Sequence, residues 1–166
     1  MLYNSEKELA QLGCAHIQSA NNAQVLVGGL GMGYTLSAAL KAVSENSQVT
    51  VAELIPEVVV WNQGPMGNCA NNPLQDPRTK VHIGDVRELL NIRQPTFDAI
   101  LLDVDNGPEG LTQKGNNSIY SLQGLDNIYK NLRPKGVLAI WSAGPDEKFT
   151  VRLKKAGFKA DSRIVR

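Results

Sequence analysis

The chain has 166 residues, with 17 Lys and Arg against 16 Asp and Glu, and 42% of its residues are hydrophobic. This length and hydrophobicity fit one compact domain over residues 1–166 and exclude a disordered chain. The balanced charge gives no overall attraction to nucleic acid or to an anionic membrane, so neither is an expected partner. No apolar run reaches the roughly 20 residues of a membrane-spanning helix. The N-terminus has no signal-peptide layout, so a cytoplasmic protein is expected.

Cysteine and histidine are scarce. Cys14 and His16 form a Cys-x-His pair, but no second pair follows at a spacing typical of zinc sites. We therefore expect no metal site, and a disulfide between the two lone cysteines, Cys14 and Cys69, is not expected in an intracellular protein.

The first half of the chain alternates predicted helices and strands. Capping and hydrophobic patterns predict a helix from Ser5 to Ile17, a strand over Gln24–Val27, a helix over Thr35–Val43, a strand over Gln48–Ala52 and a helix from Pro56 to Trp61. The proline-, glycine- and asparagine-rich stretch from Gly64 to Lys80 is predicted as a long loop or short-helix excursion.

The second half continues the alternation. The predicted elements are strand Val81–Ile83, helix Val86–Asn91, strand Phe97–Leu102, loop Asp105–Asn117, helix Ser118–Leu132, strand Val137–Trp141, helix Asp146–Ala156 closed by Gly157, and strand Phe158–Val165. Short apolar strands between helices indicate an α/β fold, a three-layer αβα sandwich around a mostly parallel sheet. Ligands of such sheets bind beyond the carboxyl ends of the strands.

A glycine-rich turn follows the first strand, with the sequence Gly28-Gly29-Leu30-Gly31-Met32-Gly33. Glycine allows positive φ angles and a close approach of the backbone to a ligand. The Gly-x-Gly-x-Gly spacing at 29, 31 and 33 is typical of methyltransferase-type domains, so Gly28, Gly29, Gly31 and Gly33 are predicted to bind a cofactor. A merely structural turn is the alternative.

Two acids follow the next two strands. Glu53, about 20 residues after the turn, can accept hydrogen bonds from two ribose hydroxyls; the alternative is a solvated or helix-capping side chain. Asp85 can accept from an adenine amino group while the Val86 N–H meets a ring nitrogen. Asp85 is also a good N-cap for the helix that follows, and both roles can hold together.

A third acid, Asp103, ends the apolar strand Phe97–Leu102 near the centre of the sheet, where a reacting group would lie. The alternative is a turn-forming cluster with Asp105 and Asn106.

Four further side chains have both a functional and a structural interpretation. Trp61 could form a lid, Trp141 and Tyr120 could border a substrate, and His82 could act as a base. Packing in the core is the favoured interpretation for Trp61 and His82, and an equal alternative for Trp141.

Five blocks taken together resemble the spermidine synthase group, within the class I S-adenosylmethionine-dependent methyltransferase superfamily. The blocks are Val25 to Gly33, Val51-Ala52-Glu53, Asp76-Pro77-Arg78 with Ile83-Gly84-Asp85, Phe97 to Asp103, and Leu132 to Leu138. The resemblance implies a Rossmann-like fold of the class I methyltransferase type. The implied cofactor is S-adenosylmethionine, its decarboxylated form, or methylthioadenosine.

The resemblance also implies roles for single residues. Gly29, Gly31 and Gly33 would line the methionine end of the cofactor, Glu53 would hold the ribose, and Asp85 the adenine. Asp103 would contact the cofactor and help to deprotonate an attacking amine. An amine with a pKa of about 10 is protonated at neutral pH and needs such help to become a nucleophile.

The substrate half of the resemblance departs from the family. The chain has Asp103-Val104-Asp105-Asn106 where the family typically has Asp-Ser-x-Asp, and it lacks matches for the polyamine-binding residues. The predicted function is therefore S-adenosylmethionine-dependent methyl or aminopropyl transfer to a small-molecule acceptor. The alternative is a non-catalytic nucleoside-cofactor-binding or assembly module. Because Arg166 comes before the last hairpin strand of this fold, we expect a sheet without that strand, or a partner, for example in a homo-oligomer, that completes the edge.

Overall fold

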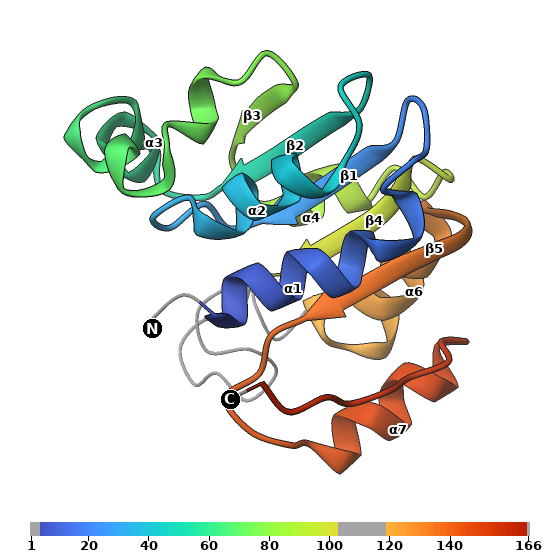
Figure 1. The fold of residues 1–166 in the computed structure, drawn as a ribbon. Coiled ribbons are helices and arrows are strands. Elements are labelled where there is room, and N and C mark those ends of the chain that lie inside the picture. The colour runs from blue at the N-terminus through green and yellow to red at the C-terminus, as the bar shows by residue number, and fades with distance from the viewer. Residues whose placement is uncertain (1–3, 103–118, 166) are drawn as a thin grey trace.

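The computed structural model describes residues 4–102 and 119–165. Its sheet has five parallel strands in the order β3-β2-β1-β4-β5 (Figure 1). The strands are β1 (Gln24–Gly28), β2 (Gln48–Glu53), β3 (Thr79–Ile83), β4 (Phe97–Leu102) and β5 (Leu132–Ile140). The predicted α/β, Rossmann-like fold is confirmed. All five carboxyl ends lie at the same edge of the sheet, which is where a ligand of this fold binds.

Helices form the outer layers. They are α1 (Asn4–Cys14), α2 (Tyr34–Ala42), α3 (Pro56–Gln63), α4 (Val86–Leu90), α6 (Leu122–Asn131) and α7 (Glu147–Lys155). In Figure 1, α1 and α2 lie in front of the sheet and α4 and α6 lie behind it. The Gly64–Lys80 excursion contains two short 3-10 helices, Pro65–Ala70 and Pro73–Gln75. None of the helices in the described ranges has the length and apolarity that crossing a bilayer requires.

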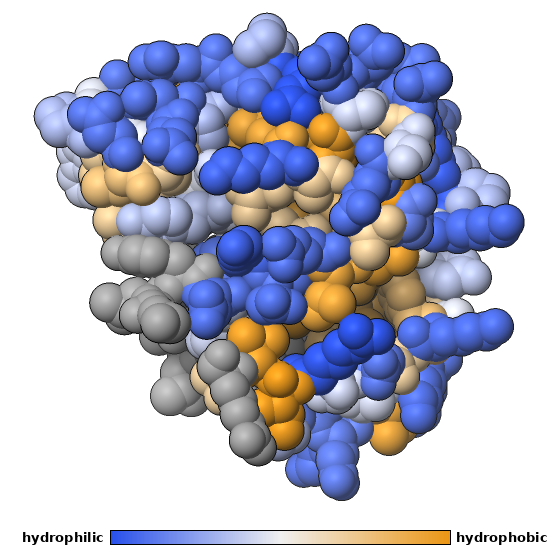
Figure 2. Space-filling view, in the orientation of Figure 1, coloured by the Kyte–Doolittle hydropathy of each residue, from blue (hydrophilic) through white to orange (hydrophobic). Residues whose placement is uncertain are grey.

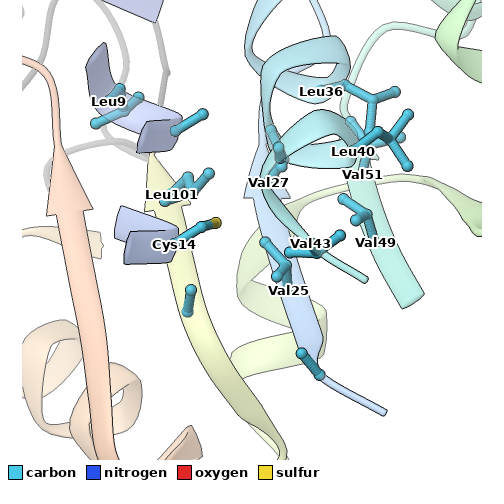
Figure 3. Packing of buried hydrophobic residues seen from close by; sticks show 14 of the residues in the cluster. Leu9, Cys14, Val25, Val27, Leu36, Leu40, Val43, Val49, Val51 and Leu101 are labelled. Atoms are coloured by element: carbon cyan, nitrogen blue, oxygen red, sulfur yellow. The ribbon is translucent and has the colours of Figure 1, made fainter. Parts of the chain in front are cut away.

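Alternate residues of each strand supply the two halves of the core. Val25 and Val27 face α1 and α2, while Leu26 faces α4 and α6, and all three are fully buried. Figure 3 shows the first half, where Leu9 and Cys14 of α1 pack beside Leu101 of β4. Burial raises the pKa of the Cys14 thiol to about 12, so this cysteine behaves as a core residue.

Several helix ends follow from local sequence. Asp146 caps α7 by accepting from the Phe149 N–H at 2.9 Å, and Gly157 ends that helix with a φ of 106°, which confirms the predicted C-cap. Helix α6 starts at Leu122 with Ser121 as its N-cap, four residues after the predicted Ser118, which lies outside the described residues.

The predicted strand Phe158–Val165 is wrong, since these residues form no strand. Of its apolar side chains, Phe158 packs against Tyr129 with ring centroids 5.1 Å apart, but Ile164 is 82% exposed. Pairing at the sheet edge would have to bury one face of the segment, but side chains of both faces stay exposed, Asp161 and Arg163 on one and Ser162 and Ile164 on the other. Within the described residues β5 is therefore an edge strand. Hydrophobic surface is visible between α1 and α7, where β5 lies (Figure 2).

The Asp76-Pro77-Arg78 block fixes the start of β3. Asp76 accepts from Arg78 Nε at 3.0 Å and from Arg78 Nη2 at 2.9 Å, while Arg78 Nη1 reaches the carbonyl of Val43 at 3.2 Å. The Arg78 side-chain hydrogen bond lowers the pKa of Asp76, and the two side chains are about one-fifth exposed, at 21% and 24%. This pair ties the β3 end of the sheet to the end of α2.

We expect Asp76→Asn to lower the free energy of unfolding at pH 7 by about 1 kcal/mol, the upper range for a partly exposed ion pair of this geometry. A carboxyl whose pKa is lowered on folding stabilises the protein above its unfolded value of 3.8, and this contribution is lost as pH falls through the folded value. In urea unfolding at pH 7, 5 and 3.5, the difference in the free energy of unfolding between the variant and the wild type should become smaller only at pH 3.5. Asp161→Asn, which removes a carboxylate with 76% exposure, is the control and should change little.

Candidate functional site

The four glycines of the turn do different things. Gly28 is buried, and a Cβ there would lie 2.8 Å from Leu102 Cδ2, so a side chain at this position would force Leu102 to move. Gly29 (φ 100°) donates its N–H to the Ala52 carbonyl at 2.8 Å, and Gly33 (φ 86°) donates to the Leu30 carbonyl at 2.8 Å. A Cβ at Gly31 (φ 52°) would meet no described atom within 4 Å. At Gly31 the described residues thus leave open space against the backbone, whereas at Gly28 and Gly33 they do not.

Glu53 ends β2 beside this open position. Its Oε1 accepts from the Gly31 N–H and its Oε2 from the Ile55 N–H, both at 3.4 Å, which is long for a hydrogen bond. The N-cap of α3 is Ile55, so Glu53 is not itself the cap residue, although its Oε2 accepts from the N–H of that N-cap. The carboxylate therefore faces the glycine turn and keeps most of its accepting capacity for another donor.

Asp85 follows β3 and caps α4, which confirms the capping interpretation. It forms a capping box with Glu88, and its carboxylate accepts from the Arg87 N–H and Nε, both at 2.9 Å. The Arg87 side chain lowers the pKa of Asp85, so this carboxylate is charged at neutral pH. Within the described ranges no group accepts from the Val86 N–H, at the first turn of α4. The third strand thus ends in an anionic acceptor and an adjacent donor.

Apolar side chains that the sequence did not single out lie at the same edge. Leu54 directly follows Glu53 and is 53% exposed, while Ile83 pairs with Glu53 in the β2–β3 register and is 54% exposed. Met32, within the glycine turn, is 39% exposed. Exposed aliphatic residues at a strand tip can cover the apolar faces of a purine. The signal that could have found them is an apolar residue within two positions of each tip acid, as Leu54 is to Glu53 and Ile83 to Asp85.

Two of the four other candidate side chains, Tyr120 and Trp141, pack in or against the core. Tyr120 is buried and packs edge-to-face on Phe149 with centroids 5.5 Å apart. Trp141 packs against the core half beneath α1 and α2. His82 Nε2 lies 3.2 Å from Glu88 Oε2. Trp61 is 55% exposed, so the expectation that it packs α3 against the sheet is wrong.

Asp103 and Asp105 lie outside the described residues, and so does the predicted loop over 105–117. The structure brings the Gly31 backbone and the Glu53 carboxylate together and sets Asp85 and Val86 at the end of the neighbouring strand β3. A cavity of about 550 Å³ lies between α4 and α6, with Asp85, Arg87 and Ser121 in its wall. Gly31 and Glu53 do not line it.

The family model described as the spermine/spermidine synthase domain matches residues 6–152. The chain belongs to this family. No curated protein sequence matches the chain. Among solved structures, a spermidine synthase from Thermotoga maritima superposes with a TM-score of 0.70 at 19% identity, covering 93% of this chain and 51% of that protein.

Two further structures share the fold. A spermidine synthase in complex with the transition-state analogue AdoDATO has a TM-score of 0.67 at 18% identity, covering 93% of this chain and 50% of its own. Human methyltransferase-like protein 13, in complex with SAH, has a TM-score of 0.65 at 19% identity, with coverages of 92% and 68%. The chain thus spans about half the length of the spermidine synthases that it matches. The chain thus combines the spermine/spermidine synthase family domain with a fold that it shares with these structures.

Proposed function

We propose that this domain is an S-adenosylmethionine-dependent transferase that moves a methyl or an aminopropyl group to a small acceptor. The cofactor is S-adenosylmethionine, its decarboxylated form, or methylthioadenosine as the product of aminopropyl transfer. Membership of the spermine/spermidine synthase family supports this class, as do structural relatives in complex with AdoDATO and SAH.

The observation that carries the proposal is the position of the Glu53 carboxylate. It lies 3.4 Å from the Gly31 N–H, beside the open space at Gly31, and it makes only long hydrogen bonds there. A ribose placed in this space would offer two hydroxyl donors to one carboxylate, which can accept both. Gly29, Gly31 and Gly33 would then line the methionine end, and Gly28 would support the turn from below.

The adenine would lie at the end of β3. Its amino group would donate to Asp85, which still has lone pairs beyond those that Arg87 uses. A ring nitrogen would accept from the Val86 N–H, and Leu54 and Ile83 would cover the faces of the ring.

Asp103, which directly follows β4, would face the acceptor. The bound cofactor would supply a sulfonium-activated carbon for the acceptor nitrogen, with a neutral thioether as the leaving group. The Asp103 carboxylate would take the proton that the acceptor ammonium must lose before its nitrogen can attack. Product masses after incubation with S-adenosylmethionine or its decarboxylated form, plus putrescine, separate methyl from aminopropyl transfer.

Three further expectations stay sequence-based predictions. They are the single domain over residues 1–166, the cytoplasmic location and the homo-oligomer.

We expect Glu53→Ala to weaken S-adenosylmethionine binding by about 1–3 kcal/mol, because ribose hydroxyls would lose their acceptor. Isothermal titration calorimetry measures this change directly. Glu57→Ala is the matched control, since it removes an exposed carboxylate from the first turn of α3, four residues away. Equal affinities of the two variants would mean that Glu53 does not hold the ribose.

Turnover separates this proposal from a non-catalytic module. A transferase forms product from the cofactor and at least one amine acceptor. A wild-type protein that binds the nucleoside but transfers no group to any amine, acid or hydroxyl acceptor would be the binding or assembly module instead.

A further inference from the structure

Asn62 of α3 connects that helix to the glycine turn. Its side chain is buried, with a relative exposure of 2%. Its Nδ2 donates at 2.8 Å to the carbonyl of Gly31 and at 2.8 Å to the carbonyl of Val58, one turn earlier in the same helix. Asn62, 31 positions further along the chain, therefore holds the Gly31 peptide, which borders open space among the described residues.

The other end of the same amide is unsatisfied. None of the residues that the structure describes donates to Asn62 Oδ1, although the atom is buried. A buried acceptor without a donor destabilises the folded state, so an asparagine here needs a reason beyond packing. The atom also lies 3.2 Å from the position of a Cβ on Gly33, which shows how tightly the turn packs on α3.

The bond to Gly31 sets the direction of the next donor. A trans peptide is planar, so the Gly31 carbonyl and the Met32 N–H point in opposite directions. With the carbonyl bound to Asn62, the Met32 N–H is directed away from α3. Among the described residues, none accepts from it.

We propose that Asn62 is a positioning residue for the cofactor, which fixes the Gly31–Met32 peptide so that the Met32 N–H can donate to the ligand. Asn62 does not touch the ligand itself, since its side chain is buried beneath the turn. The identity of the ligand rests on the proposed function, but the ordering of the turn by Asn62 does not.

Asn131 of α6 supplies a matched control. Its Nδ2 also bridges two carbonyls, that of Leu90 and that of Asn127 one turn earlier, and its Oδ1 also lacks a donor among the described residues. It is fully buried, and its bridge joins α6 to the end of α4 instead of to the glycine turn. Asn131→Leu thus removes a pair of bonds equivalent to the pair lost in Asn62→Leu, without touching the turn.

The test compares the two leucine variants by amide hydrogen exchange and by calorimetry with S-adenosylmethionine. In Asn62→Leu we expect the Gly33 N–H, bonded to the Leu30 carbonyl, to lose protection about 10-fold and the affinity to fall about 10-fold. Asn131→Leu should change the Gly33 protection and the affinity by less than about 3-fold each. Its loss of thermal stability should be similar to that of Asn62→Leu. If a leucine variant does not fold, Asn62→Ser and Asn131→Ser are compared in the same way.

Equal Gly33 protection in the two variants would overturn the inference, and so would equal affinity loss. A wild-type protein that binds no S-adenosylmethionine would instead contradict the proposed function, and the exchange measurement would still decide the role of Asn62 in the turn.

Discussion

Asp103→Asn should lower the rate of group transfer by about 10² to 10⁴-fold, the usual contribution of a positioned general base. The amide cannot take a proton from the ammonium of the acceptor, so only the small unprotonated fraction of an amine with a pKa of about 10 can react at neutral pH. The residual rate of the variant should therefore rise as the pH approaches that pKa. Steady-state rates at pH 7 and pH 9, with saturating cofactor, measure both effects.

Two further variants show whether the loss of rate is specific to Asp103. Asp161→Asn removes an exposed carboxylate from the C-terminal segment and should leave the rate unchanged. Asp105→Asn tests the neighbouring acid. A full rate in Asp103→Asn, or a larger loss in Asp105→Asn than in Asp103→Asn, would contradict the assignment of the base to Asp103.

Gly33→Ala should lower the free energy of unfolding by about 2–4 kcal/mol, which combines left-handed backbone strain with overpacking. Gly33 has a φ of 86°, and a Cβ there would lie 3.1 Å from Pro73 Cγ and 3.2 Å from Asn62 Oδ1. Neither neighbour can retreat easily, because Pro73 and Asn62 are themselves buried. Urea unfolding followed by circular dichroism measures the loss.

Gly31→Ala is the matched variant within the same turn. Its φ of 52° is also left-handed, but a Cβ there meets no described atom within 4 Å, so the free energy of unfolding should fall by only about 1–2 kcal/mol. The new methyl group would, however, occupy the open space assigned to the cofactor. For a given loss of stability, Gly31→Ala should therefore lose more affinity for S-adenosylmethionine than Gly33→Ala does. Similar stabilities for the two variants would contradict the packing described for Gly33.

Local sequence patterns predicted the strands of the sheet and several helix ends, because these features depend on neighbouring residues. The five parallel strands follow from short apolar runs, and the ends of α4 and α7 follow from Asp85 and Gly157, whose capping chemistry depends on a few adjacent residues. The apparent strand Phe158–Val165 shows the limit of such patterns. A short run of strand-forming residues is a local property, whereas a strand needs a paired neighbour and a face to bury, and Ile164 stays 82% exposed.

The candidate site was predictable in part for the same reason. Glu53 and Asp85 follow strands, and parallel strands bring their ends to one edge. Asn62 carried no signal, because its partner Gly31 lies 31 residues away and a helical asparagine has no fixed role. The different tasks of Gly28, Gly31 and Gly33 also depend on which side chains face each glycine, and this requires the tertiary structure.

The most direct measurement is a crystal structure of the protein soaked with S-adenosylmethionine or methylthioadenosine. We expect the sugar to lie against the Gly31 backbone, with both of its hydroxyl groups within hydrogen-bonding distance of Glu53. A nucleoside found instead in the cavity between α4 and α6, or a Glu53 side chain turned away from the bound sugar, would contradict the account.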